Sequence, residues 1–421
     1  MRSDPPLNGS DYLMLGFDYE LRRRGYAGNA CQIILELDAP ISAVALKNRL
    51  ADLLNRYPVL AARRGGIIFP KWKLPRRAAS PCVREHREQT GLREKISDEP
   101  LAAGRGENIR FDLITRADGR MEIIFTWAHA LMDANSAEHF LAVVGRADVP
   151  LPATAPPPPR AKKPLRERLQ RARQSILQLD EFLKNKPRTV GVRFPNAPTV
   201  QRFHVEKFSA GETARIRANG TGLCGPLGDA QFHAAISMVE LHRLHQRIGS
   251  PSPSYVLPVP VGLRPKGSVE PLFSNQITML MTQFLPAQLT TVTEAVATLK
   301  TQTAQALRGG LIESGVLLAE LARVLPLRPY VALIKHGLRG EICSFFFGNT
   351  AAVTRLLTTF FGATITDFTH VGATTPSPGI GAIFYYFQGT LRFTVLHLEP
   401  HFSAAEANVF AANLRERLLN P

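Results

Sequence analysis

Short apolar stretches alternate with amphipathic ones along the first third of the chain, which is the pattern of alternating strands and helices. Asp118-Gly119 separates two of the apolar stretches and is typical of a hairpin turn. Ser42 stands at the N-cap position of a helical pattern, and Pro58 follows the end of that pattern. The pattern predicts strands over 32–37, 66–69, 110–115 and 121–127, and helices over 42–57 and 135–144.

The same alternation resumes near residue 200 and continues to the C-terminus. There it predicts strands over 202–208, 254–261, 276–284, 342–347, 364–371, 380–387 and 391–398, and helices over 210–218, 228–246, 292–307 and 404–419. No segment repeats with a period of about 20–50 residues, which excludes solenoids and propellers. The two halves are therefore predicted to form mixed α/β lobes of comparable size.

A proline-rich segment separates these halves. It begins at Val149 and reads VPLPATAPPPPRAKKP, a composition that can hold neither a helix nor a central strand. The helical pattern over 165–184 has leucines near one face and arginines on the other. We interpret it as a solvated helix between two lobes rather than a contact for an anionic membrane or an acidic protein. The predicted division is an N-terminal lobe over 1–150, a linker with the basic helix over 151–190, and a C-terminal lobe over 191–421.

The composition is that of a globular protein, with 45% hydrophobic and 20% charged residues among 421. The formal net charge of +16 favours anionic partners, such as nucleic acid, a membrane surface or a phosphate-bearing molecule, without choosing among them. The four cysteines form no CxxC pair, which excludes a disulfide framework and a zinc ribbon. The N-terminus lacks an apolar leader and no uncharged apolar stretch reaches about 18 residues, so we expect a cytoplasmic protein.

The segment FTWAHALMDA, residues 125–134, carries the strongest candidate chemistry. An apolar strand leads into His129, Asp133 follows four residues later, and a helix begins after it. A strand-to-helix junction can direct a side chain into a cleft, and an imidazole with a pKa of about 6.5 can accept a proton from a hydroxyl or an amine. The alternative is a partly buried histidine bonded to a backbone carbonyl, with Asp133 as the helix N-cap. Spacing alone favours that structural alternative.

This segment, in its strand-then-helix setting, resembles the HxxxD (HHxxxDG) acyltransferase superfamily, which includes peptide-synthetase condensation domains, plant BAHD acyltransferases, and wax-ester and alcohol acyltransferases. Three further stretches are similar to the family in the same order: LADLLNRYPVLAARR (50–64), residues 222–244, and VPVGLRPKGSVEPLFSNQI (259–277). They match the family's first helix with the strand after it, the long helix of its second lobe, and a stretch in which an Arg precedes a Gly/Ser-Asn pair. The resemblance spans most of the chain. The DFGWG motif of the plant branch does not occur, so that branch is disfavoured.

The resemblance implies an α/β fold of two chloramphenicol-acetyltransferase-like lobes, each a mixed β-sheet flanked by helices, with a tunnel between them. It implies that His129 is the catalytic base and that Asp133 points away from the reaction and holds the active-site loop. By the same resemblance, Arg264 pairs with Asp133 across the lobe interface and Asn275 has a structural role. The resemblance implies no metal.

The resemblance also implies transfer of an acyl group from a thioester to the hydroxyl or amine of a small-molecule acceptor. The implied donor is acyl-coenzyme A or an acyl group on the phosphopantetheine of an acidic carrier protein, with no tightly bound cofactor. The alternative is a non-catalytic module of the same fold that binds an acyl carrier or a lipid. Ala134 stands where the family has Gly, and it would mark lost activity if that position required a positive φ. A nucleic-acid partner would rest on charge alone and is not predicted.

The remaining motifs favour structural interpretations. Residues 220–225 read GTGLCG and match GxGxxG, but they follow a helical pattern rather than a strand, so a helix-to-helix loop is predicted. His242 and His245 are interpreted as part of a solvated basic helix face rather than a metal site. His139 is expected to face solvent or the lobe boundary. Neither a GxSxG nor a Walker A sequence occurs, which disfavours a serine hydrolase of that type and a P-loop NTPase.

Overall fold

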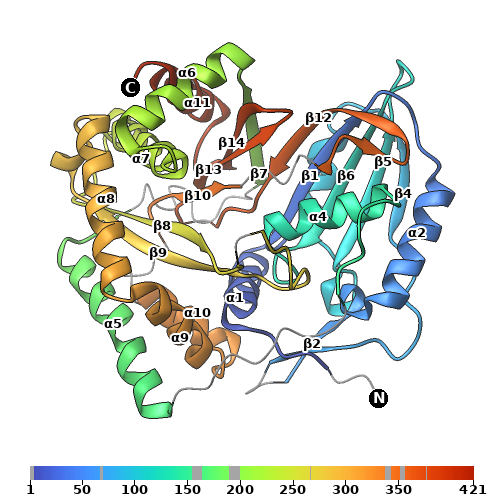
Figure 1. Cartoon of the computed structure of the whole chain (residues 1–421), viewed down its shortest axis with the longest axis horizontal. Coiled ribbons are helices and arrows are strands. Elements are labelled where there is room, and N and C mark those ends of the chain that lie inside the picture. Colours follow the sequence, from blue (N-terminus) through green and yellow to red (C-terminus); the bar gives the residue numbers. More distant parts are fainter. Residues whose placement is uncertain are drawn as a thin grey trace.

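Two α/β lobes lie side by side in the computed structural model (Figure 1). The structure describes residues 4–66, 70–153, 164–188, 200–265, 267–336, 343–350, 356–375 and 377–421. Each lobe is built on a mixed sheet that combines parallel and antiparallel pairs, with helices packed against it. This confirms the two-lobed α/β architecture that the resemblance implied.

A six-stranded sheet forms the first lobe, in the order β11-β12-β1-β6-β5-β4. Its strands are β1 (Ala30–Leu37), β4 (Val83–Arg87), β5 (Ile109–Thr115), β6 (Met121–Ala128), β11 (Thr359–Phe360) and β12 (Ala363–Val371). Neighbours are antiparallel except for β4 and β5. The helices of this lobe are α2 (Ala43–Arg56), α3 (Leu92–Asp98) and α4 (Ala134–Gly145).

The central strands of this sheet are buried on both faces, which explains their nearly continuous apolar sequence. Ile33 and Leu35 of β1 pack into the main core with residues of α2 and α4. Ile34 and Ile124 point to the other face, where they join a second cluster with Leu396 of the second lobe. The strand that leads to His129 is therefore held rigidly from both sides.

The second lobe contains a four-stranded sheet in the order β10-β13-β14-β7, together with a separate hairpin. The sheet strands are β7 (Val200–Lys207), β10 (Phe346–Asn349), β13 (Ile380–Phe387) and β14 (Thr390–Glu399), and the hairpin strands are β8 (Tyr255–Gly262) and β9 (Ile277–Phe284). Helices α6 (Ala210–Cys224), α7 (Asp229–Arg247), α8 (Val292–Arg308) and α11 (Ala404–Leu419) share its core. Phe345 and Phe347 are buried in that core.

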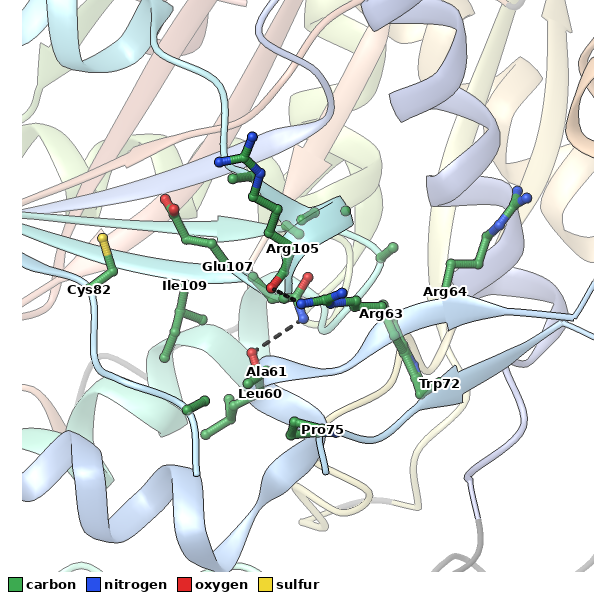
Figure 2. A pocket seen from close by; sticks show the side chains of 18 of the residues that line it. Leu60, Ala61, Arg63, Arg64, Trp72, Pro75, Cys82, Arg105, Glu107 and Ile109 are labelled. Carbon is green, nitrogen blue, oxygen red and sulfur yellow. Dashed lines mark hydrogen bonds between the residues drawn. The ribbon is translucent and has the colours of Figure 1, made fainter. Parts of the chain in front are cut away.

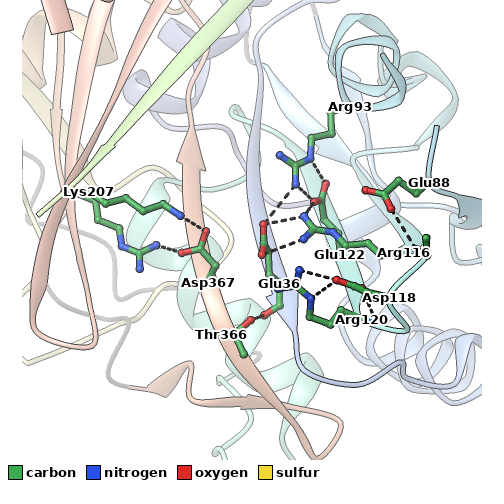
Figure 3. Close-up of polar contacts among 12 residues, drawn as sticks. Glu36, Glu88, Arg93, Arg116, Asp118, Arg120, Glu122, Lys207, Thr366 and Asp367 are labelled. Carbon is green, nitrogen blue, oxygen red and sulfur yellow. Dashed lines mark hydrogen bonds and ion pairs between the residues drawn. The ribbon is translucent and has the colours of Figure 1, made fainter. Parts of the chain in front are cut away.

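Strand β12 crosses from the second half of the sequence into the sheet of the first lobe, where it runs antiparallel to β1. Asp367 on β12 forms ion pairs with Lys207 of β7, at 2.6 Å, and with Arg392 of β14 (Figure 3). The sequence prediction placed all of 191–421 in the C-terminal lobe, whereas β11 and β12 complete the first sheet. The difference arises because the edge of that sheet is closed by a distant strand, which local patterns do not reveal.

Four further helices lie beside the hairpin: α1 (Gly9–Arg23), α5 (Leu165–Lys184), α9 (Leu311–Ala322) and α10 (Leu327–His336). Helix α1 packs on α9 and α10, and α5 packs on α9 (Figure 1). The range of α5 agrees with the predicted helix, but Leu165, Leu169 and Ile176 are exposed. Its contact with α9 is made instead by a smaller, partly polar surface that includes Ala172 and Ser175.

The minor elements are the strands β2 (Arg63–Gly65) and β3 (Lys71–Lys73) and the 3-10 turns η1 (Pro58–Ala61), η2 (Ala103–Arg105) and η3 (Pro286–Leu289). Most predicted elements agree with the structure within a few residues. The strand predicted over 342–347 instead begins at Phe346. The predicted strand over 66–69 and most of the proline-rich segment lie outside the described residues. Among the described helices, none combines the length and the apolar composition that crossing a bilayer requires.

Candidate active site

The loop between β6 and α4 carries His129 and Asp133. The loop follows directly after strand β6, which lies in the buried centre of the first sheet. The indole Nε1 of Trp127 donates a hydrogen bond to the carbonyl of Met132, at 3.1 Å, and the N–H of Leu131 donates to the carbonyl of Ala128, at 2.9 Å. These local bonds close the loop into a tight turn, so the direction of His129 is fixed by the backbone.

Asp133 is 4% exposed and uses both carboxylate oxygens. Oδ1 accepts from the N–H of Ser136 at 3.0 Å, so Asp133 is the N-cap of α4. Oδ2 accepts from the Arg264 guanidinium at 2.7 Å and from the N–H of Gln276 at 3.0 Å. Asp133 can therefore cap α4 and pair with Arg264 at the same time, because each contact uses a different oxygen of the carboxylate.

Arg264 lies in the loop between β8 and β9 of the second lobe. Besides Asp133, its Nη2 donates to the hydroxyl of Ser136 at 2.6 Å and to the carbonyls of Pro271 and Ser274 at 3.0 and 3.2 Å. One guanidinium thus joins the start of α4 to the β8–β9 loop. The side chain of Arg264 is 10% exposed, which protects these bonds from water.

Asn275 lies in the same loop and is 1% exposed. Its Nδ2 donates to the carbonyl of His129 at 2.8 Å and to Oδ1 of Asp11 at 3.0 Å. Its own N–H also donates to Oδ1 of Asp11, at 2.6 Å. Asn275 therefore fixes the backbone of His129, which agrees with the structural role that the resemblance implied.

Asp11 of α1 belongs to this network and was not predicted. Burial raises the pKa of Asp11 to about 7, while hydrogen bonds from Asn275, Asn8 and Ser274 act in the opposite direction. Asn8 and Asp11 form a capping box at the start of α1. That spacing of cap residues is the signal that could have revealed the helix from the sequence, but it gives no sign of the contact with the β8–β9 loop.

His129 lies at the meeting point of these segments. Its backbone N–H donates to the carbonyl of Asn29 at 3.0 Å, and its carbonyl accepts from Asn275, so the peptide groups on both sides are held. The residue is partly exposed. Burial lowers the pKa of His129 below its usual value of 6.5, and the Asp133 carboxylate opposes that shift only in part. The imidazole is therefore neutral at pH 7 and can accept a proton.

The backbone at Ala134 is compatible with alanine. Ala134 is the first residue of α4, and it is not among the non-glycine residues with positive φ in the described chain, which are Lys186, Phe361 and Gln388. The strain considered for this position is therefore absent. Replacement of Gly by Ala gives no structural reason for lost activity.

A buried pair on the other side of α4 was missed by the sequence analysis. Glu138 of α4 and His370 of β12 are 0% and 2% exposed, and Glu138 Oε1 lies 3.2 Å from His370 Nε2. Burial raises the pKa of Glu138, and the contact with His370 lowers it. This contact joins the helix capped by Asp133 to the crossing strand.

The interpretation of His242 and His245 as a solvated basic face is wrong. His242 and His245 are 7% and 0% exposed rather than solvated, because α7 is covered on that side. Nδ1 of His242 lies 2.9 Å from the hydroxyl of Tyr255, and Nδ1 of His245 lies 3.0 Å from the carbonyl of Ser250. His139 is 8% exposed, so it does not face solvent.

Two further features concern the described part of the chain. In that part of the chain, no group of three or more His, Cys, Asp or Glu side chains could hold a metal ion. The GxGxxG segment, residues 220–225, forms the last turns of α6 and the start of the connection to α7. Residues 220–224 are therefore helical, and the loop predicted over 220–225 is wrong except at its last residue.

No family model matches the chain, and no curated protein matches it. Solved structures match it over its full length. The first condensation domain of the CDA synthetase is 13% identical with a TM-score of 0.71, and the match covers 100% of this chain and 97% of that one. The TRI3 trichothecene 15-O-acetyltransferase of Fusarium sporotrichioides is 15% identical with a TM-score of 0.72, covering 98% and 94%. The condensation domain of the monacolin K polyketide synthase MokA is 14% identical with a TM-score of 0.62, covering 100% and 98%.

The chain has the condensation-domain fold. In this fold the two lobes contribute different parts of the candidate site: the first supplies His129 and Asp133, and the β8–β9 loop supplies Arg264 and Asn275. The sequence identities of 13–15% establish the architecture alone. The chemistry of the site is therefore inferred from the contacts of this chain.

The ion pair between Asp133 and Arg264 is expected to stabilise the fold. Because its side chains are only 5% and 10% exposed, Asp133→Asn and Arg264→Ala should each leave a buried group unpaired and lower the free energy of unfolding by about 3–5 kcal/mol. Urea or thermal unfolding measures the loss. Arg120→Ala is a matched control, because Arg120 pairs with Asp118 on the exposed surface (Figure 3) and its loss should leave the melting temperature nearly unchanged. Melting temperatures for Asp133→Asn and Arg264→Ala equal to that of the wild type would refute the pair.

Proposed function

We propose that this protein is an acyltransferase that moves an acyl group from a thioester donor to a hydroxyl or amine acceptor. The observation that carries the proposal is the placement of His129, a neutral imidazole on a loop held by Asn275 and by the Asp133–Arg264 pair. A base that must act at one position benefits from such rigid support. The likeness to condensation domains and to an acetyltransferase supports the same chemistry.

In the proposed reaction, His129 removes the proton from the acceptor as the acceptor oxygen or nitrogen attacks the thioester carbonyl carbon. The tetrahedral intermediate then collapses, the carbon–sulfur bond breaks, and the thiolate leaves with the proton that the imidazolium returns. Asp133, Arg264 and Asn275 are positioning residues, because each contacts the loop that carries His129. The carboxylate of Asp133 is occupied by Ser136, Arg264 and Gln276 and does not act as a base.

The proposed donor is acyl-coenzyme A or an acyl group on the phosphopantetheine of an acidic carrier protein. Both are anionic, and a chain with a net charge of +16 attracts them electrostatically. Solved multidomain peptide synthetases are among the structures that this chain resembles, which supports a carrier protein as the donor. The alternative is a module that binds an acyl carrier or lipid without turnover. Ala134 in place of Gly does not support this alternative, because Ala134 adopts ordinary helical backbone.

Thiol release from a panel of acyl-coenzyme A and acyl-carrier donors, with a pooled small-molecule extract as acceptor, tests the proposal. We expect release that requires the extract and falls by at least about 100-fold in His129→Ala, the range that general bases contribute. His139→Ala is the matched control, because this nearby histidine lies on α4 and has no proposed role in the chemistry. Donor binding without release by the folded wild type, for every donor of the panel, would favour the binding module.

The pH dependence of kcat/KM tests the protonation state of His129. The neutral imidazole is the active form and burial lowers its pKa, so kcat/KM should fall on the acid side, and the midpoint of this acid limb should lie below pH 6.5. Asp11 is the other titrating group at this loop, with a pKa raised to about 7. The acid limb should persist in Asp11→Asn. If the acid limb of kcat/KM disappeared in Asp11→Asn, the titrating group would be Asp11, and the assignment of the limb to His129 would be wrong.

A further inference from the structure

A cavity of about 1570 Å³ lies in the first lobe beside the loop that carries His129. Small-molecule pockets typically measure about 300–1,000 Å³, so this one has room for a chain together with its headgroup. Ala128 and Ala130, the two neighbours of His129, line its wall. So does Asn29, whose carbonyl accepts the hydrogen bond from the N–H of His129. The contacts of the Asp133 network do not involve the rest of this cavity.

The inner wall of the cavity is apolar. Leu50 and Leu54 project from α2, Leu60 from η1, and Ile109 and Phe111 from β5, and all five are buried. They belong to the main core of the first lobe, so their positions are fixed by packing. Such a wall favours hydrocarbon and disfavours a small hydrated ion.

The rim of the cavity is basic. Five exposed arginines line it: Arg63, Arg64, Arg76, Arg77 and Arg105. Nη2 of Arg63 donates to the carbonyl of Arg105 at 3.1 Å, which places this guanidinium across the cavity between β2 and η2 (Figure 2). Within the described chain, no carboxylate forms an ion pair with any of the five.

Several arginines elsewhere in the lobe, unlike those of the rim, do have carboxylate partners. On the outer face of the sheet, Arg93 and Arg116 both pair with Glu122 (Figure 3). The two acidic residues that line the cavity are also engaged away from the rim, Asp18 with Arg22 at 2.8 Å and Glu107 with Arg110 at 3.8 Å. The rim therefore presents unneutralised positive charge.

Trp72 of β3 adds an unused hydrogen-bond donor. It is 4% exposed and lines the cavity, and its indole Nε1 has no hydrogen-bond partner among the described residues. Buried N–H groups in folded proteins are nearly always paired. The indole N–H of Trp72 is an exception to that rule within the cavity lining.

We propose that this cavity binds an amphipathic anion, with its hydrocarbon on the apolar wall and its phosphate or carboxylate group among the rim arginines. Guanidinium groups bind both kinds of headgroup through paired, charge-assisted hydrogen bonds. The inference goes beyond acyl transfer, because it assigns a class of ligand to a cavity of the first lobe whether or not that ligand reacts. The wall formed by Ala128 and Ala130 brings such a ligand next to the loop of His129.

Isothermal titration with octyl phosphate as the probe tests the proposal on the whole chain. Octyl phosphate should bind at least about tenfold more tightly than octanol, which lacks the charge, and than inorganic phosphate, which lacks the chain. Coenzyme A is a second comparison ligand, because it carries phosphate groups but lacks the alkyl chain of octyl phosphate. Affinity for inorganic phosphate or coenzyme A equal to that for octyl phosphate would overturn the assignment of an amphipathic ligand.

A charge-reversal pair locates the binding. Arg63→Glu/Arg76→Glu should weaken the binding of octyl phosphate at least about tenfold. Arg166→Glu/Arg173→Glu on α5 changes the net charge equally, at exposed positions outside the cavity, and should leave the affinity unchanged. Equal weakening by both pairs would show attraction by overall charge and refute the site. Because the titration contains no thioester, and His129→Ala should bind the probe normally, failure of this proposal is distinguishable from failure of the acyl-transfer proposal.

Discussion

The buried contact between Asp133 and Arg264 is the interaction on which the rest of the candidate site depends. One carboxylate caps α4 with one oxygen and binds the second lobe with the other, so the helix start and the β8–β9 loop are fixed by the same side chain. Asn275 in that loop then binds the carbonyl of His129. The position of the base is therefore set by both lobes, although the base itself belongs to the first.

The crossing strand β12 provides the second constraint. It completes the sheet whose strand β6 leads to His129, and its His370 contacts Glu138 on α4. Asp367 on the same strand binds two basic residues of the second lobe. Because the strand and the β8–β9 loop both join the lobes around α4, a change in the relation between the lobes would move the loop that carries the base.

The sequence allowed the local part of this site to be predicted. His129 and Asp133 follow from a strand-to-helix junction, and Arg264 and Asn275 follow from the order of motifs in the resemblance. Asp11 was missed because its role depends on a contact with a loop more than 260 positions away. The same limit applies to β12 and to the histidines of α7, whose partners come from elements that the local pattern does not connect.

Helices α1, α9 and α10 show another limit. They pack against one another, and α9 in particular has apolar residues on all sides, so its sequence lacks the one-sided period that reveals a surface helix. In the arginine rim of the first-lobe cavity, by contrast, the charges were visible in the sequence. Their lack of carboxylate partners was not, because pairing depends on which elements the fold brings together.

A double-mutant cycle on Asp133 and Arg264 tests most directly the claim that the two lobes hold the base together. The free energy of unfolding and kcat/KM would be measured for the wild type, Asp133→Asn, Arg264→Met and the double variant. If the two lobes hold the base together, the double variant loses less than the sum of the single losses, with a coupling of about 0.5–3 kcal/mol in both quantities. Additive losses in both would show that the two side chains act independently and would contradict the account.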